Sequence, residues 1–329
     1  MLPLTGGKKR MKAYVGVTDI EWYRQLSAES LAHDEVNFWF PSPTQGFRAL
    51  RAGEPFLFKT HLDRTVPGLS NRIVGVGLFS GFARMHVSQA WSLLGTENGV
   101  RSVDELRARI ERYRRKPFEP LEDPEIGCVL LNSVQFFPQD QLLAAPNDFA
   151  MNIVRGRTYS IGEVGGGHSV VEAVLKHRAR SELTDAATHV IYGHTRGEPI
   201  VTIPRIGQQA FKAVIEENFH HRCAVTGDRV RPVLQAAHVL PVSEGGEHRV
   251  DNGLLLRSDV HTLFDHGYVG VDEKYRLRVS PALRERFGNG DWFYAREGTE
   301  IAVPDRPADR PNRRFLEWHM EERFLRKTV

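Results

Sequence analysis

Hydrophobic and polar positions follow two different periods along the first half of the chain. Apolar side chains that alternate with polar ones, or run continuously through β-branched and aromatic residues, predict strands. Such segments lie at residues 13–17, 36–40, 55–61, 72–85 and 126–137. Apolar side chains that recur every three to four residues predict amphipathic helices instead. These segments lie at residues 19–29, 87–95 and 102–115.

The helix expected at 102–115 begins with a clear start signal. Ser102 is followed three residues later by Glu105, a pair whose side chains can satisfy free backbone N–H groups of the first turn. Strands outnumber the helices inserted between them, so residues 12–162 are expected to form a small β-barrel, closed or half-closed. The chain as a whole is expected to be α+β.

The length of the chain favours two domains. A sequence of 329 residues exceeds the usual size of a single hydrophobic core. Residues 1–11 contain a short basic run and are expected to be a loose tail. The first domain is expected at 12–162, a glycine-rich linker with a helix at 163–203, and the second domain at 204–329.

Composition excludes several classes of protein. The only cysteines, Cys128 and Cys223, lie far apart, so neither a disulfide framework nor a CxxC zinc site is expected. No apolar run is long enough to span a bilayer, and no secretion signal is visible, so the protein is expected in the cytoplasm without a membrane partner. The net charge of +3 permits nucleic-acid binding but argues for it only weakly.

The second domain contains a compact group of histidines. The stretch from Leu234 reads LQAAHVLPVSEGGEHRVDNGLLLRSDVHTLFDHG. Its pattern predicts a strand that carries His238, a glycine-rich loop with His248 and Asn252, and a second strand that leads into a short helix. Ser258 is the expected N-cap of that helix, and Gly267 has the position of a left-handed glycine at the C-terminus.

The expected helix places two metal-binding side chains together. His261 and Asp265 are four residues apart, so they project from the same helical face. An imidazole and a carboxylate can hold a divalent cation, and a neutral imidazole nearby, such as His238, can accept a proton from water at neutral pH. Phosphodiester hydrolysis needs both functions.

Ordinary structural roles are alternatives for each of these residues. A histidine on a strand is commonly a hydrogen-bonded structural residue, and His261 with Asp265 can be a surface pair worth a few tenths of a kcal/mol. Asn252 followed by Gly253 is also a common turn pair.

The order of these residues resembles the HNH, or ββα-metal, nuclease family. The similarity extends through PRIGQQAFKAVIEENFHHRCAVTG before the histidine group and through RLRVSPALRERF and LEWHMEERF after it. It covers residues 204–324. The continuous frame CAVTG…AAHV…NGLLLRSDVHTLFDHGY is far more specific than three isolated letters.

The resemblance implies a role for each residue. His238 is then the general base, and Asn252 is the central asparagine that braces the loop. His261 and Asp265 are then the helix ligands of a divalent metal, Mg²⁺ or Mn²⁺, with other transition metals possible. Many members place a metal-binding Asp or His directly before the base, where this chain has Ala237. The site is therefore expected to have two protein ligands.

Two loop residues are candidates for contact with DNA. His248 and the neighbouring Arg249 are placed to touch a backbone phosphate. Solvation of a surface loop explains the same two residues equally well.

The first domain is similar to PUA-like domains, the superfamily of the EVE, ASCH and SRA-like readers of modified bases. The similarity rests on YVGVTDIEWY, VNFWFPSP, EPFLFKTH and NIVRGRTYSI. A reader of a flipped base needs aromatic walls and a few polar groups, although aromatic residues at such spacing are more often core. The candidate walls and polar groups are Trp22, Tyr23, Trp39, Phe40, Phe47, Asp19, Asn37, Lys59 and His61.

Together these features predict a metal-dependent DNA endonuclease that restricts double-stranded DNA with modified bases, modified cytosine above all. Cleavage of both strands needs two active sites, so a homodimer is expected. Three alternatives remain open: an HNH nuclease that reads unmodified sequence or structure, an enzyme that acts on RNA, and a non-catalytic nucleic-acid-binding protein with a decayed site.

Overall fold

The computed structural model describes residues 11–43, 46–161, 170–175 and 207–326. The chain divides into two compact units, Met1–Pro204 and Arg205–Val329. Most of the linker expected at 163–203 lies outside the described residues, but residues 170–175 are helical. Both units combine helices with antiparallel strand pairs, as expected for an α+β protein.

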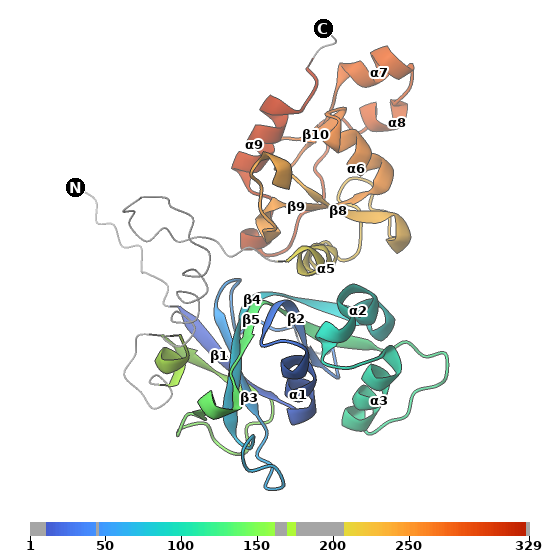
Figure 1. The fold of residues 1–329 in the computed structure, drawn as a ribbon. Helices are drawn as coiled ribbons and strands as arrows, with labels where there is room; N and C mark the ends of the chain where they lie inside the picture. The colour runs from blue at the N-terminus through green and yellow to red at the C-terminus, as the bar shows by residue number, and fades with distance from the viewer. Residues whose placement is uncertain (1–10, 44–45, 162–169, 176–206, 327–329) are drawn as a thin grey trace, which may run out of the picture. The chain divides into compact units, whose positions relative to one another are not determined.

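The first unit consists of strands with helices inserted between them (Figure 1). Its elements are β1 (Lys12–Thr18), α1 (Ile20–Glu29), β2 (Ala32–Phe40), β3 (Pro55–Thr60), β4 (Arg72–His86), α2 (Val87–Leu94), α3 (Val103–Arg114), β5 (Glu125–Phe136), β6 (Leu143–Ala144) and β7 (Gly156–Ser160). A 3₁₀ helix, η1 (Gly95–Asn98), connects α2 to the segment before α3. All the strands and helices expected from the sequence of this unit are present within a few residues of their expected ends.

One mixed sheet forms the framework of this unit. Its strand order is β2-β5-β4-β3-β1-β7, with β6 paired to β4. β1 and β3 are parallel, and the other pairs are antiparallel. Within the described residues β2 and β7 are the two ends of the sheet, and no pairing joins them. The β-barrel expected from the sequence is therefore not confirmed.

The middle strands are buried on both faces. On β3, Phe56 and Phe58 belong to one hydrophobic cluster, whereas Leu57 points the opposite way into a second cluster. Because side chains alternate along a strand, a strand with a core on each side must be apolar at every position. This explains the continuous run PFLF in the sequence.

Helix α1 covers the hydrophobic cluster that contains Phe56 and Phe58, called the aromatic cluster below. The start of this helix is fixed by Asp19. The Oδ1 atom of Asp19 accepts hydrogen bonds from the backbone N–H groups of Glu21 and Trp22 at 2.6 and 3.1 Å. Trp22 then packs on Phe58 with the ring centroids 5.2 Å apart. The cap thereby places one edge of the helix, with Asp19 and Trp22, beside the strand ends.

A buried asparagine joins η1 to the sheet. Asn98 is fully buried and accepts a hydrogen bond from the side chain of Asn37 at 2.8 Å. Its own amide donates to the carbonyls of Ala90 and Gly95, and its carbonyl accepts from the indole N–H of Trp39. These bonds hold Trp39 in a fixed orientation.

The second unit is built around a short hairpin. Its elements are α5 (Gln208–Asn218), β8 (Leu234–His238), β9 (Gly253–Arg257), α6 (Ser258–Asp265), β10 (Val269–Val271), β11 (Leu277–Val279), α7 (Pro281–Phe287), α8 (Asp291–Tyr294) and α9 (Arg313–Glu322). β8 and β9 pair antiparallel, and so do β10 and β11. Helices α5 and α6 pack on the hairpin.

Helix α6 begins one residue earlier than expected. Arg257 has the extended backbone of an N-cap, and Ser258 is already helical, so the expected cap at Ser258 is wrong. Helix and strand follow each other without a loop here, because β9 ends at the residue that caps α6. At the other end Gly267 has φ 74°. A Cβ there would lie 1.9 Å from the carbonyl oxygen of Arg323, so only glycine fits.

None of the helices in the described parts of the chain is long and apolar enough to cross a membrane.

The aromatic cluster gives a test of the fold. Phe58 is fully buried and contacts Trp22, Phe38 and Phe136. We expect Phe58→Ala to lower the free energy of unfolding by about 3–5 kcal/mol, measured by chemical denaturation. Leu121→Ala is the control, because Leu121 is 98% exposed and its loss should change stability by less than about 0.5 kcal/mol. Equal effects of the two substitutions would contradict this assignment of the core.

Candidate functional site

The hairpin of β8 and β9 sets the position of the first candidate residue. His238 ends β8 and pairs in register with Gly253, the first residue of β9. A Cβ at position 253 would lie 2.3 Å from Cδ1 of Ile215, a residue of α5. Glycine therefore lets α5 pack closely on the hairpin beside His238.

His238 is held by two rings. Phe211 of α5 stacks on its imidazole with centroids 4.2 Å apart and an interplanar angle of 10°. The Nε2 atom of His238 lies 3.0 Å from Nδ1 of His248. Burial, together with His248 and His261, lowers the pKa of His238 to about 4. The imidazole is therefore neutral at pH 7, as a proton acceptor must be.

Asn252 braces the loop between the two strands. Its side chain is fully buried. Its Oδ1 atom accepts a hydrogen bond from the backbone N–H of Leu240 at 2.8 Å, and its amide donates to the carbonyls of Leu240 and Glu247 at 2.9 and 3.0 Å. These bonds tie both ends of the loop together, one residue from His248. In the described part of the chain, the hydrogen bonds of this side chain go to the backbone of the loop, so its geometry is that of a positioning residue.

His261 and Asp265 meet on the face of α6. The Nε2 atom of His261 lies 3.3 Å from an Oδ2 of Asp265. Two metal ligands at about 2.1 Å from a cation and at right angles are about 3 Å apart, so these two atoms fit one divalent cation.

A third residue orients the imidazole of His261. Its Nδ1 atom lies 2.7 Å from Oε1 of Gln235 on β8. The amide oxygen can only accept, so Nδ1 carries the proton and the lone pair of Nε2 points toward Asp265. A neutral ring in this orientation needs a cation between its lone pair and the carboxylate, whereas a protonated ring donates an N–H group to the carboxylate directly. This arrangement is typical of a metal-binding histidine, whose other nitrogen donates to an acceptor.

The position before His238 offers no further candidate ligand. Ala237 is fully buried. Side chains alternate along β8, so Ala237 shares a face with Gln235, which contacts α6. An acidic residue at 237 would thus face the helix that carries the two candidate ligands. Among the described residues, no group of three or more His, Cys, Asp or Glu side chains could hold a metal ion.

Arg249 is already paired within the protein. Its guanidinium donates two hydrogen bonds to the carboxylate of Asp251 at 2.9 and 2.7 Å, and it lies over the ring of Phe315. The backbone carbonyl of Asp251 accepts from the backbone N–H of Asn312 at the start of α9, and its carboxylate accepts from the side-chain amide of Asn312 at 3.2 Å. The ion pair links the loop to α9. A phosphate contact by Arg249 remains a prediction.

A buried histidine of α9 packs against α6. His319 of α9 stacks on Phe264 with centroids 3.7 Å apart, and its Nε2 lies 3.0 Å from the carbonyl oxygen of Phe264. Burial lowers the pKa of His319 to about 4. These contacts are those of a packing residue. Nothing in the sequence indicates that Phe211 stacks on His238 or that Gln235 binds His261. Stacking and hydrogen bonds between distant segments leave no local pattern in a sequence.

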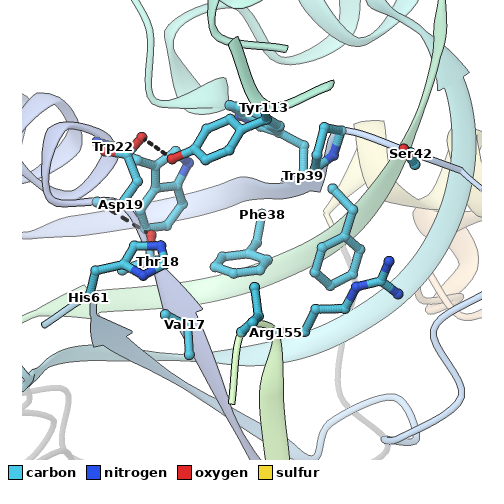
Figure 2. A pocket seen from close by; sticks show the side chains of 13 residues that line it. Val17, Thr18, Asp19, Trp22, Phe38, Trp39, Ser42, His61, Tyr113 and Arg155 are labelled. Atoms are coloured by element: carbon cyan, nitrogen blue, oxygen red, sulfur yellow. Dashed lines mark hydrogen bonds between the residues drawn. The ribbon is translucent and has the colours of Figure 1, made fainter. Parts of the chain in front are cut away.

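The first unit contains a cavity of about 370 Å³ beside the start of α1 (Figure 2). Its lining comes from β1, α1, β2, α3 and the segments after β2, β3 and before β7. The lining residues are Val17, Thr18, Asp19, Trp22, Phe38, Trp39, Phe40, Pro41, Ser42, His61, Tyr113, Val154 and Arg155.

The polar groups of this cavity lie on two sides. In Figure 2, Asp19, His61 and Tyr113 lie on one side and Arg155 on another. The Oδ2 of Asp19 accepts a hydrogen bond from the hydroxyl of Tyr113 at 2.8 Å. Burial and Asp19 raise the pKa of Tyr113 to about 12, so its hydroxyl keeps its proton. Burial lowers the pKa of His61, so its imidazole is neutral at pH 7.

Some of the residues that the sequence suggests for a base pocket line this cavity, and others lie elsewhere. Asp19, Trp22, Trp39, Phe40 and His61 line the cavity.

The other candidates for this pocket lie elsewhere in the fold. Tyr23 is 2% exposed and donates its hydroxyl to the carbonyl of Phe137, because one helical step of about 100° turns it away from Trp22. Asn37 is fully buried and bonded to Asn98. Phe47 packs against the aromatic cluster, and Lys59 is buried with its ammonium over the ring of Phe149.

Tyr113 and Arg155 line the cavity but were not predicted, because they reach it from distant segments.

Comparison with known proteins identifies one part of the chain. Residues 223–272 match the model of a family described as HNH endonuclease. The second unit therefore contains an HNH endonuclease domain, which includes the five residues His238, His248, Asn252, His261 and Asp265. A search of curated proteins gives no match.

Solved structures give weaker similarities. A mutant of an ASCH protein from Zymomonas mobilis is 12% identical, with a TM-score of 0.30, and the match covers 50% of this chain and 97% of that one. A modification-dependent restriction endonuclease, TagI, is 13% identical with a TM-score of 0.26, and the match covers 88% of this chain and 75% of that one. TM-scores of this size do not establish a shared fold.

The buried imidazole of His319 gives a prediction about acid stability. Its pKa of about 4 lies below the usual 6.5, so the unfolded chain binds more protons and stability falls as the pH drops from about 6.5 to about 4. The full loss is on the order of 3 kcal/mol. We expect His319→Asn to lower stability at pH 7.5 and to flatten this pH dependence, measured as the denaturation midpoint of the second unit. An unchanged pH dependence would show that His319 does not titrate on unfolding.

Proposed function

We propose that the protein is a metal-dependent DNA endonuclease that hydrolyses phosphodiester bonds in double-stranded DNA carrying modified bases. The observation that carries the nuclease half is the pairing of a neutral His238 with two converging ligand atoms, on His261 and Asp265, inside the HNH endonuclease domain. A proton acceptor and a cation site are the two functions that the reaction requires.

Each residue then has a defined task in the reaction. His238 accepts a proton from the attacking water. His261 and Asp265 hold Mg²⁺, Mn²⁺ or another divalent metal, which when bound supplies positive charge to stabilise the phosphate and the leaving 3′ oxygen. Asn252 keeps the loop in place. The products carry 5′-phosphate and 3′-hydroxyl ends.

Two protein ligands imply weak metal binding without DNA. His261 and Asp265 leave most coordination positions of a divalent cation to water and phosphate oxygens. The substrate therefore contributes ligands, and metal binding and DNA binding should strengthen each other.

The cavity of the first unit is proposed as the reader of the modified base. Its volume of about 370 Å³ suits a single flipped nucleobase, and the rings of Phe38 and Trp39 provide apolar surface. Asp19 presents an acceptor that suits an exocyclic amino group, which favours a cytosine derivative over thymine. Cleavage of both strands is assigned to a homodimer that acts in the cytoplasm.

An HNH nuclease that reads unmodified DNA is the main alternative. It shares the second unit and differs only in the task of the cavity. A decayed site is favoured only by Ala237, which stands where many members have a third ligand.

With Mg²⁺ or Mn²⁺, the wild-type protein should cut DNA, and EDTA should abolish cutting. His238→Ala and Asp265→Asn should each lower the cleavage rate by about 10²–10⁴-fold, since each removes a required function. His220→Ala is a matched control because the side chain of His220 is 59% exposed and pairs with the exposed Asp305. Equal activity of His238→Ala and the wild type would exclude the assigned base.

Matched DNAs with unmodified cytosine, 5-methylcytosine, 5-hydroxymethylcytosine or glucosylated 5-hydroxymethylcytosine should be cut at different rates. Asp19→Asn keeps the cap of α1, because asparagine also caps helices, but removes the charge in the cavity. We expect it to reduce the preference for modified DNA about 10-fold with little change in the rate on unmodified DNA. Equal cutting of every DNA by the wild type would support the alternative reader of unmodified DNA.

A further inference from the structure

We propose that His248 is a positioning residue for the base: it accepts a hydrogen bond from Nε2–H of His238 and thereby turns Nδ1 of His238 toward the attacking water. This inference rests on the proposed nuclease function. It gives His248 a task beside the base, in place of the phosphate contact or the solvated loop position that the sequence left open.

The contact between the two imidazoles is a direct one. The Nε2 of His238 and the Nδ1 of His248 are 3.0 Å apart, which is a hydrogen-bond distance. The two rings are inclined by 57°, so they meet at their nitrogen edges and are not stacked. Stacking on Phe211 at 4.2 Å fixes the plane of the His238 ring. Ring plane and hydrogen bond together leave His238 with one orientation.

The direction of the hydrogen bond decides which nitrogen of His238 is basic. In the described part of the chain, Nδ1 of His238 has no hydrogen-bond partner, whereas Nε2 is engaged by His248. A neutral imidazole carries one proton, and an N–H···N bond needs one donor and one acceptor. If Nε2 of His238 donates, its Nδ1 keeps a free lone pair for the proton of water. Nδ1 of His248 is then the acceptor, and Nε2 of His248 carries the second proton.

The loop is built to keep His248 in this place. The amide of Asn252 donates to the carbonyl of Glu247, the residue before His248. Gly246 lies so close to the chain that a Cβ there would be 1.9 Å from the carbonyl oxygen of Leu240. Arg249, the residue after His248, is fixed by its ion pair with Asp251. Both neighbours of His248 are thus anchored, so its imidazole has little freedom to leave the base.

In the proposed reaction His238 accepts the proton of water, and His248 stabilises the charge that His238 then carries. The O–H bond of water breaks, its proton moves to Nδ1 of His238, and the oxygen forms a bond to phosphorus. The P–O3′ bond then breaks, and the 3′ oxygen takes a proton from solvent. His238 is a cation after the first transfer, and its Nε2–H bond to His248 becomes stronger because the donor is charged. His248 therefore stabilises the state that forms in the reaction.

Two substitutions separate this task from simple packing. Asparagine places its Oδ1 close to the position of Nδ1 of histidine, so His248→Asn keeps an acceptor, whereas His248→Leu fills similar space without one. We expect kcat to stay within about 5-fold of wild type in His248→Asn and to fall about 30- to 100-fold in His248→Leu. KM for DNA should change by less than about 3-fold in both. Circular dichroism and the denaturation midpoint would verify that both variants fold.

Other outcomes would overturn the proposal. Equal loss of kcat in both variants would exclude acceptance of a hydrogen bond. Unchanged kcat with a raised KM and a weaker salt dependence of DNA binding would instead assign His248 to a phosphate.

The pH profile gives a readout that packing alone would not change. The groups that face His238 are His248 from the loop, His261 from α6 and the apolar Phe211 from α5. A protonated His248 opposes protonation of His238. In His248→Asn this opposition is lost, so the acidic limb of kcat should move to higher pH. An identical acidic limb in His248→Asn and wild type would contradict the coupling.

Nitrogen-15 NMR of the histidine side chains tests the pair without activity. His238 should be in the Nε2–H form at pH 7 in the wild type and lose this fixed form in His248→Leu. Detection of that form in a protein that cuts no DNA would reject the proposed function and keep the pairing. DNA cleavage with His238 in the Nδ1–H form would keep the function and reject the pairing.

Discussion

The buried amide of Asn252 is the interaction on which the candidate nuclease site depends. An amide without partners in a buried position costs several kcal/mol, so its burial is tolerable only with all major hydrogen bonds made. The three bonds to Leu240 and Glu247 satisfy this condition. They also close the loop between β8 and β9, and so fix the separation of His238 and His248. His238 and His248 are thereby held as a preorganised pair.

Aromatic stacking extends this order into the helices around the hairpin. Phe211 of α5 covers His238, and Phe264 of α6 covers His319. Both imidazoles are held neutral by burial, with the pKa of each lowered to about 4. One neutral ring serves as the proposed base, and the other supports the helix that carries His261 and Asp265. Burial under an aromatic ring thus serves the proposed chemistry at His238 and the packing of the fold at His319.

The first unit uses one carboxylate for two purposes. Asp19 caps α1 through Oδ1 and presents Oδ2 to the cavity, where it meets the hydroxyl of Tyr113. Folding of the helix and the polarity of the cavity are therefore linked. The arginines of α3 are mostly used within the unit: Arg109 pairs with Glu105, and Arg114 donates to the carbonyls of Pro41 and Glu125. Their density in the sequence therefore reflects internal contacts.

Local patterns in the sequence determined the elements of the fold, the hairpin with its helix, and the pairing of His261 with Asp265, because periodicity and spacing act within a few residues. The frame around His238 also predicted the HNH endonuclease domain. Only the tertiary structure decided that Phe211, Gln235 and His248 surround these residues, and that Tyr23 and Asn37 lie in the core while Tyr113 and Arg155 line the cavity. The tertiary structure also decided that no pairing joins β2 and β7, the two end strands of the described sheet. Such contacts join segments that are distant along the chain, and their energy depends on packing and burial, which no short stretch of sequence contains.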